Sequence, residues 1–444
     1  MSIEGFSPHD DPLRPFVAYR RLSPLVRPLT ERTPMELWEH DTRTLPRALR
    51  RYRRQVRDFA ERVIRPLALQ GDLDPHGDIG QRILQEAGRA GYLSDLLPFP
   101  LGSASPRVML RSLIWQHSIK MEELCAACGG AGLLIGANGL GTMPILLAGR
   151  VSQLLRFVVP AYARSRRGQP TLFAFAITEP TGGSDVEETH GAATHRPETV
   201  ARRVRGGWQL NGRKVFISGG DIADAVTVFA ALENEGMASW TCFLVKKGMQ
   251  GFRCGRNELK MGQRLSSASE LIFENMFVPD DHVIGSLRQG WALNRATLNF
   301  SRIPVGAIAL GIARGAMESA IRFVCRNRLG GKPLIHYQDV QLAVAEMLAL
   351  TSAMRAMIWQ HARTWRPNQA KASMTKVFCS DHAVDVCNIA MDLLGNHGFL
   401  HESGVEKAFR DARLTQIYEG TNDINRLAVI EDQAEWLESL IPES

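Results

Sequence analysis

Two segments that lie far apart in the sequence carry the residues best suited to chemistry. The first, IYEGTNDINR, spans residues 417–426 and places Glu419 between Tyr418 and Gly420 at the end of a predicted helix. A carboxylate at a helix end can leave the helix face and enter a cleft, where it can serve as a general base. The alternative is structural, because Gly420 can end one helix and Thr421 can cap the next while Glu419 is simply exposed.

The second segment, FAITEPTGGSD, spans residues 175–185 and follows a change from helical to strand-like sequence. By itself it predicts a strand followed by a glycine-rich turn, which Thr and Ser side chains stabilise. Motifs of other enzyme classes are missing: GGAGLLIG (129–136) has the wrong spacing for a dinucleotide fingerprint, and HExxH, GxSxG and paired Cys/His sets do not occur. We therefore expect neither a Rossmann dehydrogenase nor a metal site, so any chemistry must use an organic cofactor bound in another way.

The elements that would position both segments fall into four predicted parts. Residues 1–44 are Pro-rich without clear periodicity and predict an irregular N-terminal arm. Residues 45–170 have the hydrophobic period of a helical domain. Short β-rich runs over 171–286 predict a small, mostly antiparallel, barrel-like β domain, and the helical period of 287–444 predicts a C-terminal four-helix bundle. The expected fold class is mainly α with a central β domain.

Composition limits the class of protein. The 444 residues are 45% hydrophobic and 22% charged, which is typical of a folded globular chain. Seven scattered cysteines and the lack of a signal peptide favour the cytoplasm, and we interpret the close pair Cys125 and Cys128 as buried side chains. The uncharged stretch 124–149 is long enough for a membrane span, but its glycines, Asn138 and Pro144 favour a buried helix, so we expect no membrane.

The chain is basic, with a net charge of +7 and nine arginines against two acidic residues between Arg43 and Arg65. Most such runs are solvated helix faces. The functional alternative is an acidic partner, such as a nucleotide-bearing ligand, an acidic carrier protein or nucleic acid. Charge alone does not choose among these.

Both chemical segments resemble the acyl-CoA dehydrogenase family. Further matches lie between them in family order, namely LNGRKVFISGG (210–220), LKMGQRLSS (259–267), FENMFVPDDHVIG (273–285), GKPLIHYQ (331–338) and LLGNHGF (393–399). The resemblance runs from about Arg50 to the C-terminus, and its specificity lies in the ordered set. It implies an FAD enzyme that desaturates an acyl thioester of CoA or an acyl-carrier protein, associates as a homodimer or homotetramer, and passes electrons to a partner such as an electron-transfer flavoprotein.

The resemblance also assigns roles to residues. It implies that Glu419 removes the α-proton while a hydride passes from the β-carbon to flavin N5, and that the backbone N–H of Glu419 helps to hold the thioester oxygen. Some relatives carry the base at the position of Ser301, where a hydroxyl cannot do this work. The implied cofactor-binding residues are Phe175, Ile177, Thr178, Gly183, Ser184, Phe216, Ser218, Arg328, Gln338, Asp392, Gly395, Thr421 and Asp423, and the implied substrate-binding residues are Ser184, Arg302, Tyr418 and Gly420.

Two departures from the family pattern concern the adenosine half of FAD. Asn327 stands where the family usually has an arginine that reaches the flavin of a neighbouring subunit, and Arg326 or Arg328 is a possible substitute. Asp392 stands where Gln is usual, and Gly395 is followed by Asn where a Gly pair commonly approaches the pyrophosphate. The affinity for FAD is therefore expected to differ even if the ring site is intact.

Two other functions are compatible with the same fold. A flavin oxidase or monooxygenase would pass electrons to oxygen, although monooxygenases generally do not need an α-proton base such as Glu419. A nucleic-acid-binding protein of the alkylation-response branch would use the positive charge, although that branch carries an extra C-terminal region and this chain ends about 25 residues after Glu419.

Overall fold

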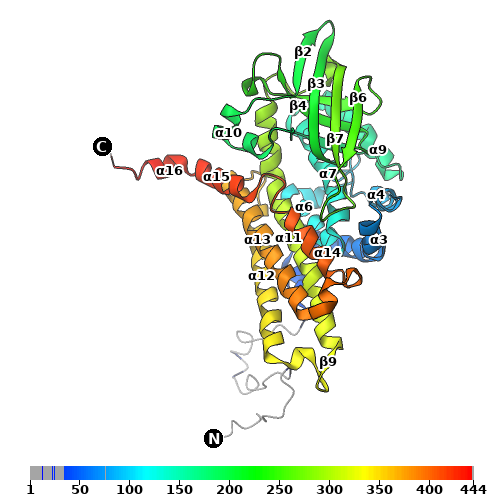
Figure 1. The fold of residues 1–444 in the computed structure, drawn as a ribbon, viewed down its shortest axis with the longest axis vertical. Helices are drawn as coiled ribbons and strands as arrows, with labels where there is room; N and C mark the ends of the chain where they lie inside the picture. Colours follow the sequence, from blue (N-terminus) through cyan, green and yellow to red (C-terminus); the bar gives the residue numbers. More distant parts are fainter. Residues whose placement is uncertain (1–12, 14–22, 24, 26–34, 76, 443–444) are drawn as a thin grey trace.

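The computed structural model describes residues 13, 23, 25, 35–75 and 77–442. Its elements follow the expected order of helices, a sheet and a second set of helices (Figure 1). The expected fold, mainly α with a central β domain and a C-terminal helical region, is confirmed. The predicted irregular arm lies outside the described residues for most of its length, and its last part is not irregular, because Leu37–Thr44 forms helix α1.

The first set of helices forms a layer that precedes the sheet in the chain. Its α-helices are α1 (Leu37–Thr44), α2 (Arg47–Phe59), α3 (Ala68–Leu73), α4 (Ile79–Arg89), α5 (Pro106–Met109), α6 (Leu113–Ala127), α7 (Gly129–Leu147), α8 (Val151–Gln153) and α9 (Val159–Arg166). On α2 the buried side chains are Leu49, Arg53, Val56 and Phe59, which recur on one helix face as its sequence predicts. Helix α6 is buried along almost its entire length, because α2 and α11 pack against it.

The central sheet is mixed and open rather than a closed barrel, so the barrel-like description is too loose. Its strands are β1 (Phe173–Ala176), β2 (Val200–Val204), β3 (Gly207–Ser218), β4 (Ala225–Leu232), β5 (Thr241–Lys246), β6 (Phe252–Asn257), β7 (Ala268–Pro279) and β8 (Val283–Ile284). They lie in the order β6-β7-β3-β2-β4-β5-β8, with β1 paired to β4. The β1–β4 and β2–β4 pairs are parallel and the others are antiparallel.

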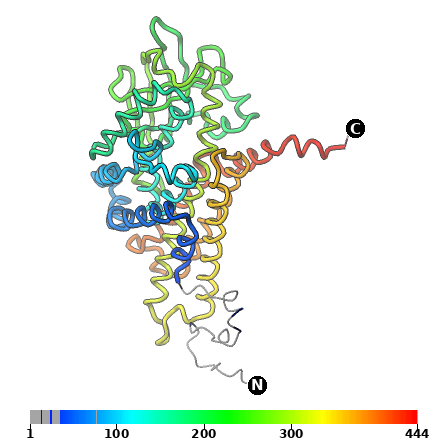
Figure 2. Tube along the Cα trace, turned by 180° about the vertical axis from the view of Figure 1, so that it is seen from behind, coloured from blue at the N-terminus to red at the C-terminus, as the bar shows by residue number. Residues whose placement is uncertain are grey.

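The C-terminal part is mainly helical, and its first three α-helices are long. Its α-helices are α11 (Gly290–Arg326), α12 (Gln338–Ala362), α13 (Gln369–Leu394), α14 (Val405–Leu414), α15 (Asn422–Asp432) and α16 (Ala434–Glu438), with a short hairpin of β9 (Arg328–Leu329) and β10 (Lys332–Pro333). Helices α11, α12 and α13 run side by side along the long axis of the molecule (Figure 1). Helix α15 packs against α13, and seen from behind the chain then extends away from the bundle through α16 toward the C-terminus (Figure 2).

Helix α7 joins the sheet to the helical layers. The main chain of α7 approaches β1 so closely that a β-carbon at Gly141 would lie 2.4 Å from the backbone of Phe173. Asn138 holds the same contact, because its Oδ1 accepts a hydrogen bond from the Phe173 N–H over 2.9 Å. This contact positions the start of the sheet over the helices.

Three described helices, α7, α11 and α12, are long and apolar enough to cross a membrane by length and composition alone. In the folded chain, 67% of the most apolar window of α7 and 78% of that of α11 are buried, against 39% for α12. The apolar residues of α7 and α11 therefore form the protein core, whereas much of α12 remains uncovered.

Candidate active site

A cavity of about 610 Å³ lies where the helical layers meet the sheet. This volume falls within the usual range for small-molecule sites, about 300–1,000 Å³. Helices α6, α7 and α11 supply an apolar part of its lining, and the start of the sheet and the loop between α14 and α15 supply the rest. Both segments singled out in the sequence thus open into one cavity.

The two segments touch each other in the cavity wall. The backbone N–H of Thr421 donates to Ser184 Oγ over 3.3 Å, which joins the α14–α15 loop (residues 415–421) to the glycine-rich turn. In the same place Glu187 packs against Gly420, where a β-carbon would lie 2.2 Å from Glu187 Oε2. Residues separated by more than 230 positions in the sequence therefore form one surface.

The α14–α15 loop holds Glu419 in an uncommon backbone conformation. Glu419 has φ of 57°, which is rare for a residue with a side chain, and Gly420 follows with φ of 80°. Asn425 Nδ2 donates to the carbonyl oxygens of Glu419, Gly420 and Thr421 over 3.2, 2.9 and 3.0 Å. Lys376 Nζ adds a bond to the Gly420 carbonyl over 2.8 Å. These hydrogen bonds therefore fix the backbone of Glu419, so the loop does more than end a helix.

The carboxylate of Glu419 accepts a hydrogen bond from Ser301 Oγ at its Oε2 over 2.7 Å. Burial raises the pKa of Glu419 above its ordinary value, although the Ser301 bond and the positive charges of Arg302 and Lys376 oppose this shift. A raised pKa brings a carboxylate closer to the range in which it accepts a proton effectively. Thr421 caps α15, because its Oγ1 accepts a hydrogen bond from the Ile424 N–H over 3.3 Å. The sequence predicted this cap.

Glu187 is a second carboxyl group in the cavity lining, and the sequence prediction missed it. Burial raises its pKa to about 7, with the charge of Glu419 adding to this effect and Arg302 opposing it. Arg302 donates from Nη2 to Glu187 Oε2 over 3.1 Å. Burial also lowers the pKa of nearby Lys376 to about 7. The sequence gives no local signal for Glu187, because the charged residues Asp185 and Glu188 lie beside it.

The sheet-side wall of the cavity contains seven of the predicted cofactor-binding residues. These are Phe175, Ile177, Thr178, Gly183, Ser184, Phe216 and Ser218. Phe216 is 59% exposed with φ of 58°, so an aromatic face stands uncovered on this wall. The turn packs tightly beneath it, because a β-carbon at Gly183 would lie 2.8 Å from Thr178 Cγ2.

The predicted substrate-binding residues are also near Glu419. Tyr418, Gly420 and Ser184 line the cavity, and the buried Arg302 lies just behind it on α11. Other predicted residues are not brought to the cavity. Asp423 is exposed and pairs with Arg426 over 2.9 Å, and Thr421 adjoins the lining without being part of it.

Four further predicted cofactor-binding residues lie at the opposite end of the helical bundle. Arg328 is in β9, Gln338 begins α12, Asp392 is in the last turn of α13 and Gly395 follows that helix. The sixteen-residue separation between Lys376, which binds the α14–α15 loop, and Asp392 corresponds to about 24 Å along a helix. A single chain therefore does not bring these four residues to its own cavity.

The α6 side of the cavity has one polar side chain that no sequence signal indicated. His117 lines the cavity beside Met121, and its Nδ1 lies 3.1 Å from the Leu113 carbonyl oxygen. Its Nε2 lies 3.5 Å from Asp95 Oδ1. A β-carbon at Gly136 would lie 2.8 Å from Met121 Cε, so the glycine leaves the room that Met121 occupies. The spacing of α6 alone did not reveal which of its buried residues face a cavity.

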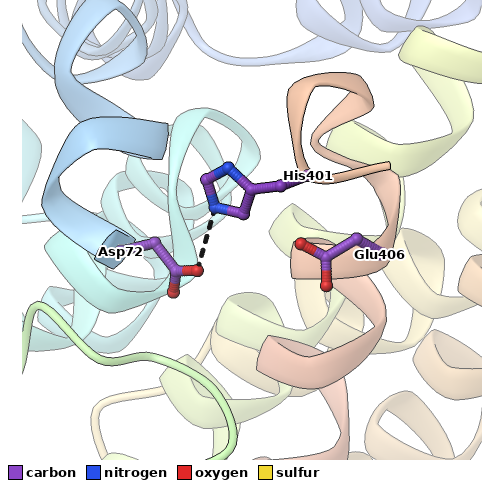
Figure 3. A group of neighbouring side chains, drawn as sticks. All are labelled: Asp72, His401 and Glu406. Carbon is purple, nitrogen blue, oxygen red and sulfur yellow. Dashed lines mark hydrogen bonds and ion pairs between the residues drawn. The ribbon is translucent and has the colours of Figure 1, made fainter. Parts of the chain in front are cut away.

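One group among the described residues has the spacing of a metal site, and it contains Asp72, His401 and Glu406 (Figure 3). His401 Nε2 lies 3.2 Å from Asp72 Oδ2. Arg410 donates to Asp72 Oδ2 over 2.7 Å and to Glu406 Oε2 over 2.6 Å. Because the guanidinium already supplies the positive charge between the carboxylates, we interpret the group as an ion-pair cluster that ties α3 to α14.

Family models match three consecutive parts of the chain. "Acyl-CoA dehydrogenase, N-terminal domain" matches residues 47–164, the middle domain matches residues 174–276, and the C-terminal domain matches residues 288–433. The chain belongs to the acyl-CoA dehydrogenase family. It is therefore a flavin oxidoreductase of an FAD-dependent family whose general reaction is the dehydrogenation of acyl thioesters.

Similar proteins share nearly the whole length of the chain. It is 37% identical over 378 residues to the cyclohex-1-ene-1-carbonyl-CoA dehydrogenase of Geobacter metallireducens, covering 84% of this chain and 94% of the relative. It is 33% identical over 393 residues to the mitochondrial short-chain specific acyl-CoA dehydrogenase of Bos taurus, covering 87% and 90%. The structure of butyryl-CoA dehydrogenase from Megasphaera elsdenii matches with a TM-score of 0.79 at 28% identity, covering 88% of this chain and 99% of that one.

Proposed function

We propose that this acyl-CoA dehydrogenase family member converts an acyl thioester to its 2-enoyl thioester, with Glu419 as the base. The observation that carries the proposal is the position of Glu419, which is fixed by Ser301 and its loop in the same cavity as the exposed Phe216. A desaturase needs a base at the α-carbon and a two-electron acceptor at the β-carbon of one substrate. Glu419 is placed to act as the base, and the wall that contains Phe216 is suited to binding the electron acceptor.

The sheet-side wall fits the flavin ring of FAD. An isoalloxazine is flat and has polar edges, so it requires an aromatic or apolar face together with hydrogen-bonding groups. Phe216 offers an uncovered aromatic face, and Thr178, Ser184 and Ser218 offer hydroxyl groups in the same lining. Bound FAD would supply the acceptor for the hydride that leaves the β-carbon.

The chain's own residues would perform the proton-transfer half of the reaction. Glu419 would accept the α-proton on its carboxylate, while Ser301 holds Oε2 in place. Among the described residues the backbone N–H of Glu419 makes no hydrogen bond within the chain, which leaves it free to donate to the thioester oxygen. Such a donor would stabilise the negative charge that develops on that oxygen as the proton leaves. The apolar side chains of α7 and α11 would exclude water from the acyl group.

The substrate is best proposed as a CoA thioester. The similar proteins are named for cyclohex-1-ene-1-carbonyl-CoA, butyryl-CoA and short-chain acyl-CoA substrates. The basic run before Arg65 gives little support for a carrier protein or for nucleic acid, because much of its charge is already paired. Arg53 is buried against Glu122 and Glu123 over 2.8 and 2.7 Å, and Arg54 pairs with Glu39 over 2.7 Å.

We also propose that the active form is a homodimer or homotetramer in the cytoplasm that passes electrons to a partner such as an electron-transfer flavoprotein. The remote positions of Arg328, Gln338, Asp392 and Gly395 support the assembly, because these residues could bind the adenosine half of FAD only in another subunit. The largely uncovered apolar helix α12 also supports it, since such surfaces commonly form subunit contacts.

The variant Glu419→Gln tests the proposed base. Gln keeps the size of the side chain but cannot accept a proton, so we expect FAD binding to persist and the rate of flavin bleaching by acyl-CoA to fall by at least ~100-fold. Stopped-flow absorbance of the flavin measures this rate directly.

Glu233→Gln is the matched control, because Glu233 is exposed just after β4, outside the cavity, and the chemical change is the same. Its bleaching rate should equal that of the unaltered protein. A Glu419→Gln protein that bleaches at a rate close to the original would refute the role of Glu419. Purified protein that stays colourless when mixed with FAD would refute the proposed function as a whole.

A further inference from the structure

Glu187 occupies a position in the cavity wall that the proposed reaction does not explain. It ends the short helix η6 (Ser184–Glu187), between the turn on the sheet side and the loop that carries Glu419. Only 4% of its surface is exposed. The segment is held from behind, because Trp291 Nε1 donates to the Val186 carbonyl oxygen over 3.1 Å. A buried carboxyl group is costly unless it is paired, so its retention here calls for a physical reason.

The partner of Glu187 is Arg302, the residue next to the one that holds Glu419. Ser301 donates to Glu419 Oε2 over 2.7 Å, and Arg302 donates from Nη2 to Glu187 Oε2 over 3.1 Å. The other end of the guanidinium, Nη1, donates to Ser373 Oγ over 3.1 Å. Arg302 therefore points toward Glu187 and Ser373. It does not bond Glu419, although the adjacent residue, Ser301, does.

Three other charged side chains lie near Glu187, and each comes from a different element. Arg302 comes from α11, Lys376 from α13 and Glu419 from the α14–α15 loop. Lys376 Nζ is occupied by the Gly420 carbonyl and by Asn422 Oδ1, over 2.8 and 2.7 Å, rather than by either carboxylate. Arg302 is thus the cation most able to pair with Glu419 if Glu187 did not engage it.

An ion pair between Arg302 and Glu419 would harm a base. The guanidinium would stabilise the ionised carboxylate, lower its pKa and occupy an oxygen that has to receive the proton. Glu187 meets the guanidinium at a fixed place, because its Oε2 packs against Gly420 in a gap that only glycine leaves. The arrangement keeps the positive charge close to Glu419 without a direct contact.

We propose that Glu187 is a positioning residue, which holds the guanidinium of Arg302 away from the Glu419 carboxylate so that this carboxylate stays free to accept a proton. The inference rests on the proposed function, because it assumes that Glu419 is the base.

The test is an infrared titration of the carboxylic C=O band that Glu419→Gln abolishes, carried out on the FAD-loaded protein without substrate. In Glu187→Gln the guanidinium loses its carboxylate partner and turns to Glu419. We therefore expect the Glu419 transition to move to lower pH by about one unit, as for a carboxylate that gains an adjacent opposite charge. The acid limb of the flavin-bleaching rate should move in the same direction.

Three further variants make the result specific. Glu187→Asp keeps a carboxyl group as the partner of Arg302 and should keep the Glu419 transition at its original pH. The double variant Glu187→Gln/Arg302→Gln leaves no unpaired guanidinium, so it should fold even if the single variant does not, and its transition should lie at or above the original pH. Glu431→Gln removes the carboxylate that α15 contributes to the Arg295–Glu431 pair, outside the cavity, and should leave the Glu419 transition unchanged.

A Glu419 transition that is unchanged in Glu187→Gln, or that moves equally in the double variant, would overturn the inference and assign Glu187 a purely structural role. This outcome differs from failure of the proposed function, because the titration requires no turnover. If Glu419→Gln bleaches normally, the function fails even when the titration behaves as expected.

Discussion

At the scale of single residues, the reactivity of Glu419 depends on opposing influences. Burial raises its pKa, while the hydrogen bond from Ser301 favours the ionised form and lowers it. The proposed reaction requires the ionised form, so the rate should rise with pH through the pKa of Glu419 and fall below it. Ser301 therefore sets where the acid limb lies, although a hydroxyl cannot itself act as the base.

The variant Ser301→Ala tests this balance. Removing the 2.7 Å hydrogen bond destabilises the ionised carboxylate, so the pKa of Glu419 should rise further and the acid limb should move to higher pH. The measurement is the flavin-bleaching rate as a function of pH. Ser319→Ala is the control on the same helix, because Ser319 Oγ donates to the Gly315 carbonyl over 3.0 Å and accepts from Arg322 over 3.2 Å, with no contact to a carboxylate. If the acid limb of the pH–rate profile stays in place or moves to lower pH in Ser301→Ala, Ser301 does not lower the pKa of the group that limits the rate.

At the scale of elements, the α14–α15 loop holds Glu419, the proposed base, against Glu187, and Gly420 permits this close packing. In Gly420→Ala, the positive φ of 80° costs about 1–2 kcal/mol, and the new methyl group meets Glu187 Oε2. We expect a larger loss of stability than this backbone cost, together with at least ~10-fold slower bleaching if misplacement of a catalytic group has its usual effect. Thermal unfolding and stopped-flow absorbance measure the two effects.

Gly206→Ala separates the two causes. Gly206 has φ of 78° but no atom within 4 Å of its added β-carbon, so this variant carries the backbone cost without the clash. Its free energy of unfolding should fall only by the backbone cost, and its flavin-bleaching rate should not change. Equal effects in both variants would show that crowding at Glu187 is unimportant.

The same loop shows how much of the site the sequence could reveal. The cap at Thr421 followed from local residue types, whereas the proposed role of Glu419 came from the resemblance of its motif to the family. Glu187 and His117 were not predicted, since their roles depend on contacts with residues more than 80 positions away, such as Arg302, or on which face of a buried helix meets a cavity. The mostly antiparallel pairing was predicted, but the parallel pairs of β1 and β2 with β4 were not, because such pairing leaves no local signal.

At the scale of the whole molecule, buried ion pairs join helices that are distant in sequence. Glu122 and Glu123 of α6 bind Arg53 of α2, Arg314 of α11 and Arg355 of α12, at distances from 2.6 to 2.8 Å. A second cluster, around Asp72, joins α3 to α14 (Figure 3). Helix α14 leads directly into the loop that carries Glu419, so this cluster anchors the active site to the N-terminal helices.

The Asp72 cluster predicts how stability depends on pH. Burial by itself would raise the pKa of Asp72, but the contacts with Arg410, Lys407 and His401 together hold it below its ordinary value. A lowered folded-state pKa gives stability that is fully present above the unfolded pKa of about 3.9 and is lost as the pH falls through the folded value. Asp72→Asn should therefore lower the free energy of unfolding at pH 7 by about 1.5–3 kcal/mol, as for hydrogen bonds to a charged group. The deficit should shrink below about pH 4, where Asp72 of the unaltered protein also becomes neutral.

Urea unfolding at pH 7 and at acidic pH measures both values, and Asp58→Asn is the matched control. Asp58 is 58% exposed and pairs with Arg62 one helical turn away, so its loss should change the free energy of unfolding by less than about 0.5 kcal/mol at either pH. Because α14 is anchored by Asp72, the Asp72→Asn protein should also bleach its flavin more slowly than the control. A variant as stable as the control at pH 7, or one whose deficit persists at acidic pH, would show that the cluster does not contribute through the charge of Asp72.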